Sequence, residues 1–144
     1  MYNTSRIDIY NYVFNLLYDG DVVKNVYPMF EPQELTESDV ADGFVVIRVG
    51  DVVDESEFQE EAFARCRVYI EAFIPTKTRG RLDSEKFDSY EKAINAAVKK
   101  AVKEDGEYSV LEDSVLSSDV EEESNANNFF HVFIKSFVVL IDQH

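Results

Sequence analysis

The chain has 144 residues, of which 45% are hydrophobic and 13% aromatic, so its length and apolar content fit one domain around a single core. Its 14 Lys and Arg against 29 Asp and Glu give a formal net charge of -15, which repels phosphate groups and argues against direct binding to nucleic acid or anionic lipid. The single cysteine, Cys66, excludes a disulfide within the chain, and we expect it to be a buried small residue in a reducing compartment.

The first predicted element is a helix that Thr4 or Ser5 caps and that ends at Asp19 and Gly20. Residues 1–19 show no signal-peptide pattern. The apolar residues recur at the spacing of one helical face: Ile9, Val13, Leu16 and Leu17. A brief edge strand follows at residues 26–30, before a proline.

Two strands and a charged tip come next. Residues 31–42 carry charge and few apolar side chains, so we expect a loop. Residues 44–53 and 64–74 read as strands of a long hairpin, with a bulge at Gly50 and an acidic tip at residues 54–61. In the second strand apolar residues alternate with polar or aromatic ones, which is the period of a sheet with one buried face.

The clearest predicted element is a second helix. It follows the basic loop at residues 77–81, begins at a cap formed by Asp83 or Ser84, and stops at Gly106. Its apolar stripe comprises Phe87, Tyr90, Ile94, Ala97, Val98 and Ala101.

The end of the chain is predicted to contain two strands. Residues 108–116 suggest the first, and residues 117–128 read as a polar, acidic connection. Residues 129–141 are apolar on both alternating faces, which is typical of a central strand covered on two sides, and they are too short to span a membrane, so we expect a soluble protein. Two helices can cover one side, and a neighbouring subunit is a plausible cover for the other.

These elements predict one α+β domain over residues 1–144. We expect a mostly antiparallel sheet of about five strands with two helices packed on one face, in the order α-β-β-β-α-β-β.

Residue types that carry chemistry are sparse. His131 and His144 have no Cys or His partner at zinc-site spacing, and Cys66 lacks the setting of a nucleophile. The five glycines form no phosphate-binding motif, and the acidic residues near Asp51 lack a calcium-loop pattern, which leaves at most weak surface binding. We therefore expect no catalytic residue, cofactor or specific metal site.

The basic loop stands out in so acidic a chain. Its simplest interpretation is a solvated loop that balances nearby acids. The alternative is docking: if copies form a ring, this loop meets an acidic segment of the next copy. The candidate interface residues are the basic Lys77, Arg79 and Arg81 and the acidic Asp54, Glu55, Glu57, Glu121, Glu122 and Glu123.

The order of elements resembles that of tail terminator, tail completion and neck-ring proteins of long-tailed bacteriophages. The likeness runs from the first helix through Asp142 and lies in pattern-level matches at Val26-Tyr27-Pro28, Phe44-Val45-Val46-Ile47, residues 67–73, the helix beginning near Asp83, and residues 133–141.

The resemblance implies a non-catalytic subunit of a ring, a hexamer or a dodecamer, that is assembled in the host cytoplasm and lies in the neck or tail of the virion. Its implied neighbours are connector, portal or tail tube proteins. DNA would only pass through the lumen, and the acidic charge is compatible with that role because it repels the DNA backbone.

Two alternatives stay open. A small acidic inhibitor or binding module would mask one basic protein partner and be monomeric alone. An enzyme that uses a pair of carboxylates would instead require acids with perturbed pKa values in a cleft, and it ranks last.

Overall fold

The computed structural model describes residues 4–18, 22–54, 63–77, 81–103, 106–125 and 128–142. The elements run in the order α1 (Arg6–Leu17), β1 (Val26–Pro28), α2 (Glu37–Asp42), β2 (Phe44–Val49), β3 (Val53–Asp54), β4 (Phe63–Pro75), α3 (Ser84–Lys103), β5 (Tyr108–Asn125) and β6 (Asn128–Asp142).

The strands form one mixed, mostly antiparallel sheet, which confirms the predicted α+β class. Its order is β1-β2-β4-β6-β5, and the two-residue β3 pairs with the start of β4 off this path. Only β1 and β2 run parallel in the described sheet, with α2 in the connection between them. The long hairpin is also confirmed, because β2 pairs with β4 in antiparallel register from Phe44 opposite Phe73 to Val49 opposite Val68.

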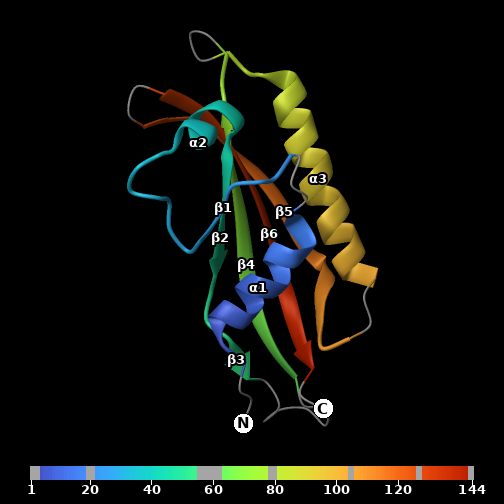
Figure 1. The fold of residues 1–144 in the computed structure, drawn as a ribbon. Helices are drawn as coiled ribbons and strands as arrows, with labels where there is room; N and C mark the ends of the chain where they lie inside the picture. Colours follow the sequence, from blue (N-terminus) through green and yellow to red (C-terminus); the bar gives the residue numbers. More distant parts are fainter. Residues whose placement is uncertain are drawn as a thin grey trace.

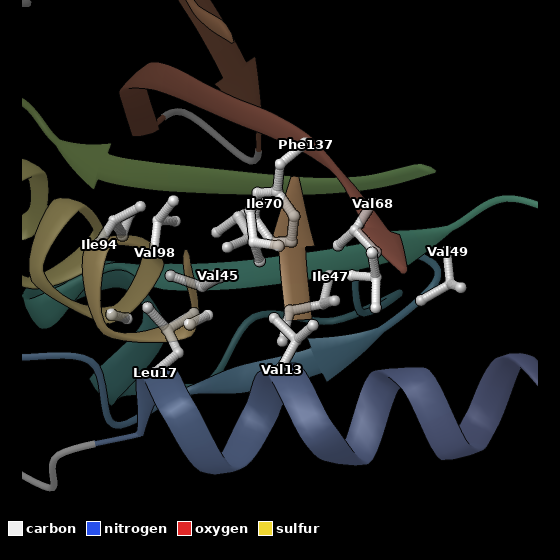
Figure 2. Close-up of a cluster of buried hydrophobic side chains, with 14 of the residues drawn as sticks. Val13, Leu17, Val45, Ile47, Val49, Val68, Ile70, Ile94, Val98 and Phe137 are labelled. Carbon is white, nitrogen blue, oxygen red and sulfur yellow. The ribbon is translucent and has the colours of Figure 1, made fainter. Parts of the chain in front are cut away.

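Helices α1 and α3 cover one face of the sheet, as predicted (Figure 1). Ser5 and Asp8 form a capping box at the start of α1, and Asp83 accepts a hydrogen bond from the Lys86 amide at the start of α3. Figure 2 shows the apolar side chains that meet between the helices and the sheet, among them Val13 and Leu17 of α1, Ile94 and Val98 of α3, and Val45, Ile47 and Ile70 of the strands.

On the opposite face, the described residues form a second apolar cluster at the end near α2. There Phe44 stacks on Phe73 at 4.6 Å between ring centroids, and Phe130 meets both rings edge-on. Leu35, just before α2, packs against this second apolar cluster. The cover expected from a neighbouring subunit is thus supplied here, in part, by the chain itself.

The prediction of a loop over residues 31–42 is wrong in its second half. Residues Glu37–Asp42 form α2, whose capping box joins Thr36 and Asp39 in both directions, with N···O distances of 3.1 and 2.9 Å. The low apolar content hid this helix, because its buried residue is Asp39, a member of the capping box, and not part of an apolar stripe.

The predicted acidic connection at residues 117–128 is also wrong. Strand β5 continues to Asn125 and pairs with β6 almost throughout, with register shifts between Leu111 and Leu116 and between Val120 and Glu123. An edge strand needs a hydrogen-bonding partner on one side only, so polar residues can continue it wherever β6 provides that partner.

The predicted strand over residues 44–53 is divided. Strand β2 ends at Val49, and β3 resumes at Val53. Between them Gly50 still donates its amide to the Arg67 carbonyl at 2.8 Å, consistent with the predicted irregularity at this glycine.

Candidate interaction surfaces

The basic loop leaves the end of β4 that lies near α2 (Figure 1). Lys77 and Arg81 are both exposed, and the Lys77 amide donates to the Arg81 carbonyl at 2.7 Å, which holds the two ends of the loop together. Arg79 lies outside the described residues. The loop therefore presents at least two cations at one end of the sheet.

The tip of the β5–β6 hairpin lies at the same end of the sheet. Glu123 is opposite Phe130 on β6, and Phe130 is opposite Pro75 on β4. Glu121 and Glu122 precede Glu123 on the same strand. The structure thus brings the backbone of these three acidic residues to the level of the basic loop.

Asp54 lies at the other end of β4. It pairs with Ala64, eleven residues before Pro75, which at about 3.3 Å per residue corresponds to about 35 Å. Glu55 and Glu57 lie outside the described residues. Asp54 and the basic loop of one copy are therefore far apart.

Cys66 is buried, as predicted, and its Sγ lies 3.3 Å from the Gly50 carbonyl oxygen. Burial raises the pKa of the Cys66 thiol to about 11, against a smaller opposing effect of the Arg6 charge. A thiol with this pKa is almost wholly protonated at neutral pH, so Cys66 behaves as a packing residue.

His131 lies on β6 opposite Ile74, on the face that carries the main core. Its Nδ1 atom is buried and has no hydrogen-bond partner among the described residues. His144 lies outside them.

Within the described ranges, no group of three or more His, Cys, Asp or Glu side chains is arranged to hold a metal ion. In the same ranges, none of the helices has the length and apolarity that crossing a membrane requires.

Sequence reasoning missed an apolar surface on the second face of the sheet, at the end away from α2. We call it the open patch, and it comprises Arg67, Tyr69, Leu111, Leu116 and Leu140, with the buried Ser136 and Val138 between them. Two rows of directly paired residues build it: Leu116, Ser136 and Tyr69 in one, and Leu111, Val138 and Arg67 in the other. The exposed fractions are 60% for Leu116, 39% for Tyr69 and 37% for Leu111.

A single exposed aromatic residue was missed as well. Phe30, two residues after the end of β1, has 76% of its surface exposed. The preceding Met29 has a φ of 68°, a left-handed conformation that non-glycine residues rarely adopt. The local sequence signal was an aromatic side chain between two prolines, Pro28 and Pro32.

Comparison of the sequence with models of protein families gives no match. A search of curated proteins finds none with significant similarity. The chain is thus a mixed-sheet α+β domain. Its candidate interaction surfaces are the end of the sheet that carries the basic loop, and the open patch.

Proposed function

We propose that the chain is a non-catalytic structural subunit that assembles with its own copies into a ring, of the kind that joins head and tail in long-tailed bacteriophages. The observation that carries this proposal is the open patch. A sheet face with apolar side chains exposed side by side is typical of a surface that another protein covers.

The charge of the chain supports a channel role. At a formal net charge of -15, the walls of a ring built from this subunit repel the phosphate backbone of DNA, so DNA can pass without adhering. Sequence-specific binding of nucleic acid is not part of the proposal.

The position of the basic loop favours one of the two acidic segments as its contact on the next copy of the ring. In a ring whose axis runs along the strands, copies related by rotation keep equivalent elements at one level, and the basic loop shares its level with Glu121, Glu122 and Glu123. Asp54 lies about 35 Å away along the strand direction, so it suits a neighbour stacked above or below, such as a connector, portal or tail tube protein.

The first test is the absolute mass of the purified protein by light scattering over a range of concentrations, with electron microscopy of any large species. We expect a closed ring with a central opening. A strict monomer at every concentration contradicts the proposal and favours the acidic module that masks a basic partner, which the net charge also suits.

A charge-reversal experiment tests the contact between loop and hairpin. The double variant Arg79→Glu, Arg81→Glu is expected to lose assembly, and Glu121→Lys, Glu122→Lys in the same chain is expected to restore it. The matched control is Lys99→Glu, Lys100→Glu, which reverses the same charge on exposed residues of α3. Assembly that is unchanged by the loop variant would falsify this contact.

A further inference from the structure

The open patch combines apolar side chains with a cation. Arg67 donates from Nη1 to the neutral Ser136 Oγ at 3.4 Å. By contrast, Arg48 is held by Glu71 at 2.6 Å. A partner suited to this surface offers an apolar side chain beside carboxylates.

Phe30 lies at the other edge of the sheet from β5, and hydrogen bonds hold the backbone around it in place. The Met29 amide donates to the Ile47 carbonyl at 2.8 Å, and Arg48 Nη1 donates to the Met29 carbonyl at 2.5 Å. The Phe30 amide donates to the Pro28 carbonyl at 2.7 Å. These bonds maintain the left-handed conformation of Met29, and a strained backbone held in this way is characteristic of a functional position.

Two exposed glutamates follow Phe30 in the sequence. Glu34 and Glu37 are exposed and follow it by four and seven residues, in the segment that leads into α2. An exposed ring followed in the same segment by exposed carboxylates matches the apolar and cationic character of the open patch.

The two surfaces lie at opposite edges of the sheet. Phe30 follows the edge strand β1, whereas Leu111 and Leu116 lie on the other edge strand, β5. One copy can therefore use both surfaces at once with two different neighbours.

We infer that Phe30 of one copy docks on the open patch of a second copy, with Glu34 and Glu37 facing Arg67. This inference rests on the proposed function and names its contact. The interface is heterologous, because two different surfaces meet, and such contacts close into rings when the rotation between copies permits.

The test uses two variants of the full chain. Phe30→Asp removes the docking residue, and Tyr69→Asp with Leu116→Asp disables the patch; all three side chains are exposed, so the core is retained. Each variant alone is expected to be monomeric, with self-association weakened at least about 30-fold, as for a central aromatic residue of an interface. Ile7→Asp, which changes a 51% exposed isoleucine of α1 outside both surfaces and outside the basic loop, is the control expected to assemble normally.

Mixing the two variants gives the decisive result. One variant keeps an intact patch and the other an intact Phe30, so the mixture is expected to form a 1:1 heterodimer that grows no further, measured by light scattering and sedimentation. Circular dichroism checks that each variant is folded, and Tyr69→Ser with Leu116→Ser replaces the patch variant if that one is not.

The outcomes separate the inference from the proposed function. If the wild-type chain and both variants assemble alike, or if the mixture stays monomeric while the wild type assembles, the Phe30 contact is overturned and the ring proposal stands. If the wild-type chain is monomeric at every concentration, the ring proposal itself is overturned, and this contact with it.

Discussion

At the scale of single residues, the junction between α2 and β2 depends on a glycine. Gly43 has a φ of 89°, and a Cβ atom added there would lie 2.7 Å from the Phe73 carbonyl oxygen and 2.9 Å from both the Pro75 Cδ and the Tyr90 hydroxyl. That hydroxyl donates to the Asp42 carbonyl at 2.8 Å. Both backbone conformation and space thus require glycine here.

We expect Gly43→Ala to lower the free energy of unfolding by at least about 2 kcal/mol, because the strained φ and the close backbone contact act together. The matched control is Gly106→Ala, where an added Cβ meets nothing within 4 Å, and its effect is expected to stay within about 0.5 kcal/mol. Urea denaturation of both variants measures the difference. Equal stabilities would show that the loop relaxes around the methyl group.

A second residue-scale feature is the contact between Tyr27 and Asp39. The Tyr27 hydroxyl lies 2.8 Å from both carboxylate oxygens of Asp39, which is fully buried. Burial raises the pKa of Tyr27 to about 12 from 10.0, and the Asp39 hydrogen bond and charge act in the same direction.

This contact predicts a stability loss at high pH. Below pH 10 Tyr27 is protonated in both states; between pH 10 and about 12 the unfolded chain loses the proton while the folded chain retains it, so stability falls as the pH rises. Tyr27→Phe is expected to flatten this part of the profile, measured by urea denaturation at stepped pH. A variant profile parallel to that of the wild type would assign the loss to other groups.

At the scale of elements, one side chain links β5 to β6 at the point where the pairing register between these two strands shifts. Ser114 Oγ accepts a hydrogen bond from the Val138 amide at 2.8 Å and donates to the Leu111 carbonyl at 2.5 Å. The serine therefore replaces a backbone partner for β6 between Leu111 and Leu116, where the regular pairing is interrupted.

We expect Ser114→Ala to cost about 1 to 3 kcal/mol, because it leaves the Val138 amide without this partner inside the sheet. Ser118→Ala, an exposed serine on the same strand, should change stability by no more than about 0.5 kcal/mol. Amide hydrogen exchange at Val138 gives a local readout in addition to denaturation. Unchanged protection in the Ser114 variant would mean that another group takes over the hydrogen bond.

At the scale of the whole molecule, one core joins elements from the entire chain. The main cluster contains Ile9 from α1, Ile47 from β2, Val68 from β4, Ile94 from α3 and Val110 from β5, together with residues of β6. Removing any one of these elements exposes the apolar residues of the others.

Unfolding is therefore expected to be a single cooperative transition. Far-ultraviolet circular dichroism, which follows the helices and the sheet, and tyrosine fluorescence should give the same denaturation midpoint. Two separated midpoints would indicate that part of the chain, such as the β5–β6 hairpin, folds independently.

The candidate surfaces were predictable from the sequence only in part. The basic loop was found because Lys77, Arg79 and Arg81 stand out against an acidic background. Leu111 and Leu116 gave no such signal, because their exposure follows from the register between β5 and β6 and from which part of the second face α2 leaves uncovered.

The sequence by itself determined α1, α3, β4 and β6, because the spacing of buried residues in each element is visible among residues close together in the sequence. In β4 every second residue is buried, at Val68, Ile70, Ala72 and Ile74, and in α3 Tyr90, Ile94 and Ala97 recur once per turn. Only the tertiary structure decided the strand order, the parallel pairing of β1 with β2, the length of β5 and the exposure of Phe30. Each of these depends on hydrogen-bond partners or covering side chains that lie far away in the sequence, where local patterns carry no information.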